Sequence, residues 1–269
     1  MKITFLGTGG GRINLIKQFR STAGFFIEGS KIIYVDPGVG VIHQARRFKV
    51  PLHLVDVLIV SHPHLDHAND AEVAVEAMTR ATLKKRGVII ADSLSLHGSG
   101  FVGNLISIVA EIFPIKHTYF ERALSLYHQS LVDRVYELLP GKIIKFNNTT
   151  IKGTKTKHDD PAVGFVLEMD GKRIGYTSDT EYFEGLSQQF NDCDVIVINM
   201  LRFTKPEFSG HMWPETVTKF LKEANPKMAI LTHFGGQFIK TNADNVAKGI
   251  TKESGVKTFA ARDGRRFDI

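Results

Sequence analysis

Four potential metal ligands within six residues constrain this chain more than any other feature. His62, His64, Asp66 and His67 form a His-x-His-x-Asp-His run directly after the apolar segment 55–60. The apolar segment predicts a buried strand, and alternation along its extended end would place His62 and His64 on the same side. Neutral imidazoles and a carboxylate, without a thiolate, suit zinc, manganese or iron. The run therefore predicts a metal site rather than a chance pair of surface histidines.

Length and composition indicate a globular protein. The chain has 269 residues, of which 43% are hydrophobic and 23% charged, which argues against disorder and low complexity. We expect a single domain over residues 1–269. The one cysteine, Cys193, excludes an internal disulfide and a Cys-x-x-Cys metal site. No apolar run is long enough for a membrane span, and glycines interrupt the apolar start of the chain, so we expect a cytoplasmic protein.

The chain carries an excess of positive charge. There are 34 lysine and arginine residues against 28 aspartate and glutamate residues, which gives a formal net charge of +6 at pH 7. This balance favours anionic partners through the long-range field, although many soluble proteins are as basic. No block of basic residues is typical of a nucleic-acid-binding arm, and 84–86 is one of the densest basic spots.

Apolar runs and turn signals predict two β-rich halves separated by helices. Hairpins are predicted around Gly29–Ser30 and Asp170–Gly171. Helices are predicted over 71–86 and 214–224, and helical spacing over 123–139 makes 94–140 a mainly helical segment. Strands are predicted over residues 2–6, 22–27, 31–35, 55–60, 88–90, 142–146, 149–152, 164–169, 172–176, 194–198 and 227–231. This pattern favours an α/β protein with layered sheets and helices outside.

The His-x-His-x-Asp-His run resembles the signature of the metallo-β-lactamase superfamily. Further residues follow that family's order of motifs: Asp36 after an early apolar run, His158 in Lys-His-Asp, Asp179 in Thr-Ser-Asp-Thr, and His233 in Leu-Thr-His-Phe. The resemblance covers nearly the whole chain apart from 94–140. It implies a four-layer αββα sandwich with a helical insertion near 94–140.

The resemblance also implies a centre of two divalent metal ions, Zn²⁺ or Mn²⁺. His62, His64 and His158 would hold the first ion, Asp66, His67 and His233 the second, and Asp179 would bridge them. A hydroxide between the ions would be the nucleophile, and Asp36 would orient a ligand histidine from behind. Without the other motifs, Asp36 would read as an ordinary turn residue and Asp179 as a helix cap.

Two features outside the ligand set resemble the phosphodiesterase branch of the family, namely tRNase Z and the cyclic phosphodiesterase of phosphonate catabolism. Gly7, Thr8 and Gly9 follow the first predicted strand and would bring the backbone close to a phosphate. A tight glycine-rich loop explains them equally well. His211 is similar to the additional histidine that those enzymes place before the fifth motif, where it serves the phosphate or the leaving group.

Other positions argue against particular branches. The β-lactamases carry cysteine where this chain has Asp179, which argues against β-lactam hydrolysis. The long arm with which tRNase Z grips tRNA has no counterpart between His158 and Asp179. Met212 and Trp213 also depart from the small residues that follow the additional histidine in tRNase Z.

The favoured function is a phosphodiesterase that acts on small or cyclic phosphodiesters, with Asp66 and His211 as catalytic residues. A tRNase Z-like RNA endonuclease and a thioester or lactone hydrolase remain alternatives. So does a nucleic-acid-binding protein that keeps the fold and a structural metal. The expected partner is a phosphorylated small molecule or a nucleotide. RNA and a homodimer stay open, and a membrane is not expected.

Overall fold

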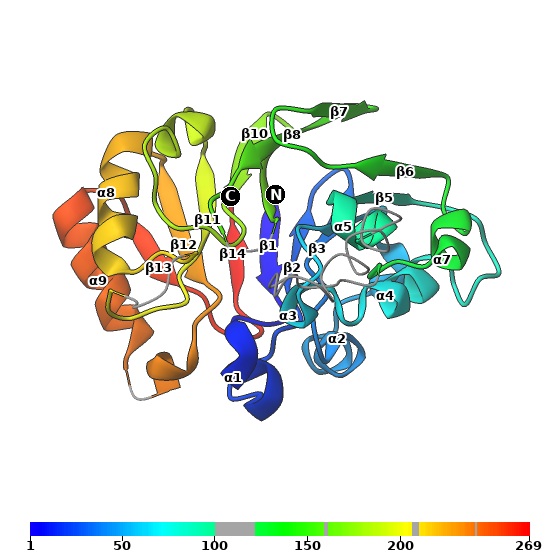
Figure 1. Cartoon of the computed structure of the whole chain (residues 1–269), viewed down its shortest axis with the longest axis horizontal. Helices are drawn as coiled ribbons and strands as arrows, with labels where there is room; N and C mark the ends of the chain where they lie inside the picture. The colour runs from blue at the N-terminus through cyan, green and yellow to red at the C-terminus, as the bar shows by residue number, and fades with distance from the viewer. Residues whose placement is uncertain (100–121, 159–160, 206–209, 240) are drawn as a thin grey trace, which may run out of the picture.

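The computed structural model describes residues 1–99, 122–158, 161–205, 210–239 and 241–269. Two seven-stranded mixed sheets pack face to face, and helices cover their outer surfaces (Figure 1). This is the four-layer αββα arrangement that the sequence predicted. Among the described helices, none combines the length and the apolar character that crossing a membrane requires.

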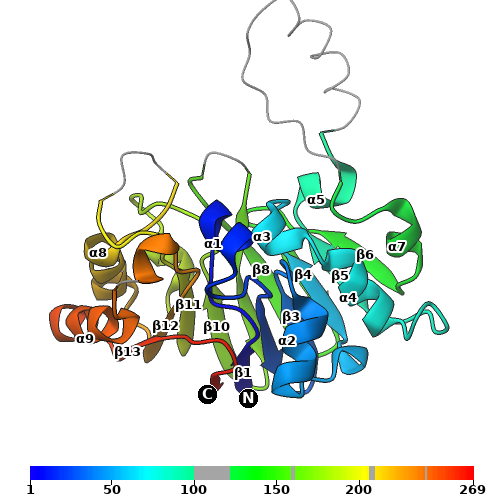
Figure 2. The same ribbon diagram turned by 90° about the horizontal axis from the view of Figure 1, so that it is seen from below.

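The first sheet is formed mainly by the N-terminal half of the chain. Its strand order is β14-β1-β2-β3-β4-β5-β6. The strands are β1 (Lys2–Phe5), β2 (Phe25–Glu28), β3 (Ile32–Val35), β4 (Val57–Val60), β5 (Val88–Ala91), β6 (Arg134–Glu137) and β14 (Arg266–Asp268). The C-terminal strand β14 pairs antiparallel with β1, so the two chain ends lie side by side (Figure 2).

The second sheet is formed by the C-terminal half, in the order β13-β12-β11-β10-β9-β8-β7. Its strands are β7 (Ile143–Phe146), β8 (Thr149–Lys155), β9 (Val163–Met169), β10 (Lys172–Tyr176), β11 (Val195–Asn199), β12 (Met228–Thr232) and β13 (Thr258–Ala260). The predicted hairpins at Gly29–Ser30 and Asp170–Gly171 join β2 to β3 and β9 to β10, as expected.

Helices lie on both outer faces. On the first sheet they are α2 (Val41–Phe48), α3 (Leu65–Ala68), α4 (Ala71–Met78), α5 (Ser93–His97) and α7 (Leu126–Ser130). The second sheet is covered by α8 (Pro214–Ala224) and α9 (Ala243–Ser254). The short helix α1 (Gly11–Lys17) lies beside α3 at the edge opposite the chain ends (Figure 2). Single 3₁₀ turns are η1 (Leu52–Leu54), η2 (Ser187–Phe190) and η3 (Gly236–Ile239).

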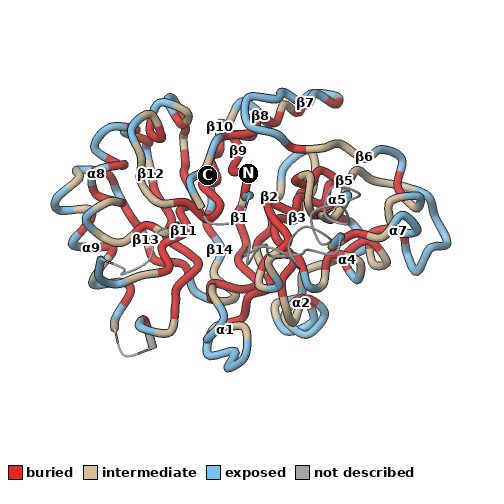
Figure 3. Tube along the Cα trace, viewed as in Figure 1, coloured by how far each residue is buried: buried red, intermediate tan, exposed pale blue. Residues whose placement is uncertain are grey.

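Three apolar cores hold the four layers together. Along β4, Val57 and Ile59 pack into the core between the two sheets, while Leu58 and Val60 pack into the core under α2 and α4. A third core joins the second sheet to α8 and α9. Burying one such side chain stabilises the fold by about 1.5–3 kcal/mol. Figure 3 shows the burial concentrated in the strands and the exposed residues on the outer helices.

The predicted helical insertion near 94–140 is only partly correct. Residues 100–121 lie outside the described part of the chain. Within 123–139, the helix is limited to α7, and the residues after it form β6, which pairs in parallel with β5. Val135 and Tyr136 favour strands, and a free edge of β5 accepts them, so pairing overrides the helical spacing. The helix predicted over 71–86 also ends early, at Met78.

The parallel strands determine where polar side chains gather. Strands β3, β4 and β5 are parallel, and so are β10, β11, β12 and β13. The carboxyl ends of parallel strands share one edge of a sheet, which is where α/β proteins bind ligands. The motif residues Asp36, His62, Asp179 and His233 all lie at or just after such ends.

Candidate metal centre

The His-x-His-x-Asp-His run turns from the end of β4 into α3. His62 is fully buried, and its Nε2 lies 3.0 Å from Nδ1 of His64, so the two rings share a side. Asp66 and His67 lie in the first turn of α3. The Nε2 atom of His67 lies 3.7 Å from Oδ2 of Asp66. All four side chains therefore face one small region.

The second sheet brings the remaining ligand candidates to the same region, with Asp179 in their middle. Its Oδ2 atom lies 3.8 Å from Nε2 of His62, 3.5 Å from Nε2 of His67, 4.0 Å from Nε2 of His158 and 3.8 Å from Nδ1 of His211. Its Oδ1 atom lies 3.5 Å from Nδ1 of His233. Residues far apart in the chain thus converge on one buried carboxylate.

The donor atoms form overlapping groups that are close enough to hold metal ions. Each group keeps its ligand atoms within 4.8 Å of one another: His62, His67 and Asp179; His64, His158 and Asp179; Asp66, His67 and His233; and Asp179, His211 and His233. The second group contains two of the three histidines expected at the first ion, and the third contains the residues expected at the second ion. The first group joins His62 with His67, which the expected division assigns to different ions. His62 lies next to both His64 and His67.

The unpaired nitrogens of this cluster fit a bound cation. The Nε2 atoms of His67 and His233 lie 2.9 Å apart. The Nδ1 atoms of His211 and His233 are buried without a hydrogen-bond partner among the described residues. Burying unpaired polar atoms costs free energy. A divalent cation between these atoms would satisfy them, since imidazole and carboxylate are the donors that zinc and manganese accept.

The electrostatics of the cluster also suit metal binding. Burial and the neighbouring His67 lower the pKa of His62 well below its ordinary value. Burial opposes ionisation of Asp179, but the charges of His233 and His67 outweigh it and hold its pKa well below the usual range. For His67, Asp179 and other carboxylates outweigh the effect of burial and raise its pKa.

Asp36 lies behind His67 and orients it. Its Oδ2 atom is 2.8 Å from Nδ1 of His67, and it also accepts hydrogen bonds from the hydroxyls of Ser61 (2.7 Å) and Tyr176 (2.6 Å). Its Oδ1 atom accepts from the Ser61 amide at 2.7 Å. A carboxylate on Nδ1 leaves Nε2 of His67 directed at the centre, as in other metal-ligating histidines.

Asn199 holds the central carboxylate in the same way. Its Nδ2 atom donates to Oδ1 of Asp179 at 2.7 Å and to the hydroxyl of Tyr176 at 3.1 Å. Sequence reasoning missed Ser61, Tyr176 and Asn199. Each had a weak signal, since Ser61 and Tyr176 flank recognised motifs and Asn199 is a polar residue at the end of an apolar run.

Left-handed backbone conformations turn the chain sharply at three strand ends in the centre. Asp36, Ser178 and His233 have φ angles of 50°, 53° and 59°. Non-glycine residues rarely adopt this conformation, and it costs about 1–3 kcal/mol for each residue. Such residues cluster where the surrounding structure imposes a functional geometry.

The glycine-rich loop after β1 has a task different from the phosphate binding predicted for Gly7, Thr8 and Gly9. The amides of Gly7 and Gly9 donate to the carbonyls of Gly24 and Ser21, each at 2.9 Å. Buried Thr8 donates its hydroxyl hydrogen bond to Asp263 at 2.7 Å. These donors are occupied by the protein itself, so the geometry does not favour phosphate binding by the three residues.

The following two glycines of this loop contact the metal-ligand candidates instead. A Cβ atom on Gly10 would lie 2.3 Å from the ring of His233. The amide of Gly11 donates to Oδ2 of Asp66 at 2.6 Å. The absence of a side chain at Gly10 therefore leaves room for the His233 ring, and Gly11 fixes one oxygen of Asp66.

Known proteins share sequence similarity with this chain. A beta-lactamase superfamily domain model matches residues 106–234. An uncharacterised protein of Methanocaldococcus jannaschii is 33% identical over 273 positions, which cover 100% of this chain and 95% of that protein. A protein of Pelotomaculum thermopropionicum that is named a metal-dependent hydrolase is 28% identical over 239 positions, covering 87% of this chain and 84% of that protein.

Solved structures share the fold over its full length. The metallo-beta-lactamase fold protein YhfI of Bacillus subtilis has a TM-score of 0.73 at 20% identity, covering 99% of this chain and 98% of that chain. The short form of human tRNase Z has a TM-score of 0.69 at 16% identity, and the match covers 100% of this chain and 99% of that chain. A diphosphatase of the PhnP family has a TM-score of 0.62 at 14% identity, and the match covers 100% of this chain and 97% of that chain. Together with the match to the beta-lactamase superfamily domain model and the full-length relative of 33% identity, this shared fold shows that the chain belongs to the metallo-β-lactamase superfamily.

Proposed function

We propose that this hydrolase cleaves phosphodiesters, in particular small or cyclic ones, with two divalent metal ions. The observation that carries the proposal is the carboxylate of Asp179, whose oxygens have five histidine nitrogens 3.5–4.0 Å away. One of them belongs to His211, whose side chain keeps 17% of its surface exposed. The centre thus combines a ligand set for metal ions with one histidine that can reach a substrate.

In this proposal the ligand candidates divide between two ions. His62, His64 and His158 would hold the first, Asp66, His67 and His233 would hold the second, and Asp179 would be shared between them. Zn²⁺ and Mn²⁺ both suit these donors. When bound, such a metal pair lowers the pKa of a water molecule and neutralises the charge that develops on phosphoryl oxygens.

The protein's own residues orient this chemistry. Asn199 fixes the Asp179 carboxylate, and Asp36 fixes the His67 ring. Burial opposes ionisation of Asp66, but His67 and His233 outweigh it and hold its pKa far below the usual range. Because Asp66 stays ionised at neutral pH, its carboxylate would serve as a metal ligand and as a hydrogen-bond acceptor that orients a water molecule.

His211 would assist departure of the leaving group. Its ring lies between those of His158 and His233, with centroids 5.1 and 5.9 Å away. Burial lowers its pKa to about 4, so the ring is neutral at pH 7 and carries one N–H. That N–H donates a hydrogen bond to a phosphoryl or leaving oxygen, which stabilises the negative charge that forms there.

An RNA endonuclease of the tRNase Z type is the second candidate. The net charge of +6 favours an RNA substrate, and human tRNase Z shows that this fold carries RNA cleavage. However, the described residues between His158 and Asp179 form only the β9–β10 hairpin, which leaves no long arm there to grip tRNA. A small phosphodiester therefore remains the preferred substrate. A thioester or lactone hydrolase would use the same ligands without needing His211.

The proposal is tested by metal analysis and hydrolysis of bis-p-nitrophenyl phosphate. We expect two metal ions per chain and faster turnover of this phosphodiester than of a thioester. The variant His211→Ala should lower kcat about 100-fold, the range for loss of one hydrogen-bond donor to the developing charge, while the metal content stays unchanged. The matched control is His97→Ala, because the His97 side chain is 60% exposed in α5. Unchanged phosphodiester turnover in His211→Ala, or faster thioester turnover, would contradict the proposal.

A further inference from the structure

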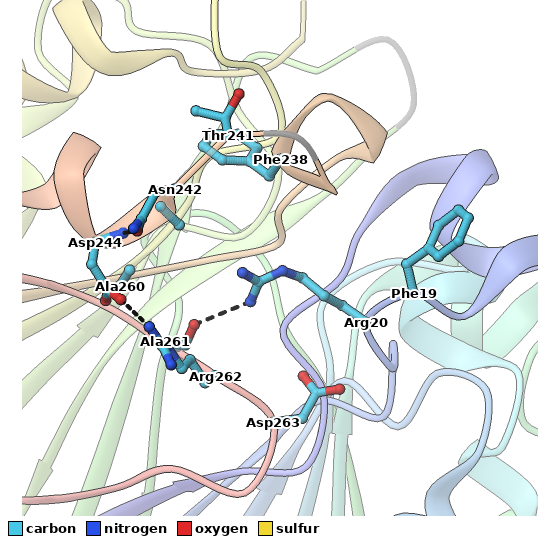
Figure 4. Close-up of a pocket in the computed structure, with 11 residues that line it drawn as sticks. Phe19, Arg20, Phe238, Thr241, Asn242, Asp244, Ala260, Ala261, Arg262 and Asp263 are labelled. Carbon is cyan, nitrogen blue, oxygen red and sulfur yellow. Dashed lines mark hydrogen bonds and ion pairs between the residues drawn. The ribbon is translucent and has the colours of Figure 1, made fainter.

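A cavity of about 540 Å³ lies one strand beyond His233 along the second sheet. Residues 19–20, 242–244 and 260–263 contribute to its walls (Figure 4). Because β12 and β13 are parallel, this cavity lies at the same carboxyl edge as His233, where open α/β sheets bind ligands. Nothing in the proposed phosphodiesterase chemistry uses it.

The guanidinium of Arg20 has hydrogen-bond donors to spare in this cavity. Its Nη1 atom donates to the hydroxyl of Thr8 at 3.0 Å and to the carbonyl of Ala261 at 3.3 Å, and its Cζ lies 4.8 Å from the centroid of the Phe234 ring. Among the described residues, no carboxylate lies within ion-pair distance of Arg20, and its Nε and Nη2 have no hydrogen-bond acceptor. Figure 4 shows the guanidinium directed toward the start of α9.

The other charged groups of the cavity already have hydrogen-bond or ion-pair partners, and the charge of Asp263 also acts on Arg20. Asp263 accepts hydrogen bonds from the hydroxyl of Thr8 at 2.7 Å and from the amide of Ser21 at 2.8 Å. Arg262 forms an ion pair with Asp244. Burial lowers the pKa of Arg20, and the charge of Asp263 compensates only in part. The half-buried guanidinium therefore keeps donors on Nε and Nη2 that an anion from solution can use.

The remaining walls suit an anion with an apolar body. Asn242 caps α9, a helix of 12 residues, and the positive end of its dipole faces the cavity. Thr241 adds a hydroxyl, while Phe238 and half-exposed Phe19 add aromatic surface. One polar end and one aromatic side are typical of small-molecule sites.

We propose that this cavity is a second, metal-independent anion-binding site that takes a phosphate or carboxylate group carried on an aromatic or aliphatic body. The anion pairs with the free edge of the Arg20 guanidinium and faces the start of α9 at Asn242. Its apolar body lies against Phe19 and Phe238. This inference does not depend on the proposed phosphodiesterase activity.

The glycine-rich loop after β1 separates the cavity from the metal centre. Thr8 faces Arg20, whereas Gly10 faces His233. Between them, the amide of Phe234 donates to the Thr8 carbonyl at 2.8 Å, and the amide of Gly10 donates to the Phe234 carbonyl at 3.1 Å. A ligand bound at Arg20 therefore lies behind this loop, so its binding does not require metal ligands.

The test is calorimetric titration of the full-length, metal-loaded protein with phenylphosphonate and, in a parallel series, with benzoate. We expect Arg20→Gln to weaken binding at this site about tenfold or more, because a charged hydrogen-bond partner is lost. Asn242→Asp should weaken it similarly, since aspartate caps a helix as well as asparagine does but repels an anion. Lys17→Gln, at the exposed end of α1, is the matched control and should bind as the wild type does.

The variant Asp179→Asn, which alters the metal centre, distinguishes ligand binding at the Arg20 cavity from ligand binding at the metal centre. Phenylphosphonate binding that persists in Asp179→Asn and weakens in Asn242→Asp supports the proposal, even where Arg20→Gln fails to fold. Binding that disappears in Asp179→Asn and is unchanged in Asn242→Asp places the ligand at the metals alone and overturns it. Tighter binding of phenylphosphonate identifies a phosphate as the natural group, and tighter binding of benzoate a carboxylate. Failure of both probes to bind Asp179→Asn also overturns the proposal.

Discussion

Tyr176 shows how a residue outside the recognised motifs can set the geometry of the centre. Its hydroxyl donates to Asp36 and accepts from Asn199, so it joins the residue behind His67 to the residue that holds Asp179. We predict that Tyr176→Phe weakens metal binding about tenfold, the range for partners of metal ligands. Competition with a chromophoric chelator measures this. Tyr182→Phe is the control, because the Tyr182 hydroxyl donates to Glu223 at the surface, and equal affinities in both variants would contradict the prediction.

Asp92, which is not a ligand candidate, should make the stability of the fold depend on pH. Burial raises its pKa from 3.8 to about 7, and the charge of Asp36 adds to the shift. The unfolded carboxyl ionises near 3.8 while the folded one stays protonated, so the free energy of unfolding falls as the pH rises from about 4 to about 7.

The variant Asp92→Asn should remove this loss of stability. Asparagine can still accept the hydrogen bonds from the amides of Leu94 and Ser95 that cap α5. We expect equal stability of variant and wild type at pH 4, and greater stability of the variant at pH 8 by about 1–4 kcal/mol, since one pKa unit corresponds to about 1.4 kcal/mol. Urea unfolding at both pH values measures this, and a variant that is destabilised equally at both would contradict it.

At the scale of elements, the sequence predicted the helices, strands and turns whose formation depends on residues close together in the chain. The β9–β10 hairpin follows from Asp170–Gly171, because two-residue turns select their residues strongly. The helix over 123–139 was wrong because β6 is set by its partner β5 rather than by its own spacing. The motif residues could be assigned from the sequence, but Tyr176 and Asn199 could not, since their roles depend on pairing between strands distant in the chain.

The loop after β1 supports a prediction about Gly10. A Cβ atom there would meet the His233 ring at 2.3 Å, so Gly10→Ala should displace the ring and lower metal occupancy and turnover together. Gly249→Ala is the control, because nothing lies within 4 Å of its added Cβ. That change lies inside α9 and should stabilise the protein by about 0.5–1 kcal/mol. Metal content by elemental analysis and thermal unfolding distinguish the two, and full occupancy in Gly10→Ala would exclude this role of the loop.

At the scale of the whole molecule, the proposed metal ions would join the two halves of the fold. Asp66, His67 and His62 come from the first sheet and its helices, whereas Asp179, His158 and His233 come from the second. Removing the ions would leave buried carboxylates and imidazoles facing one another across the interface between the sheets, with only protons to compensate their charge. The loss should therefore destabilise the entire fold and not only the site.

We predict that chelation lowers the melting temperature and that Zn²⁺ or Mn²⁺ restores it. Ligand at a thousandfold excess over its Kd stabilises a protein by about 4 kcal/mol, and each kcal/mol shifts the Tm of a chain of this size by about 2–4 °C. A shift of about 8 °C or more is therefore expected by differential scanning calorimetry. Asp179→Asn removes the carboxylate shared by both halves, so its Tm should respond weakly to added metal. If chelated and metal-loaded wild type melt at the same temperature, the two sheets are held together by their apolar core alone, and the seven residues do not form a metal centre.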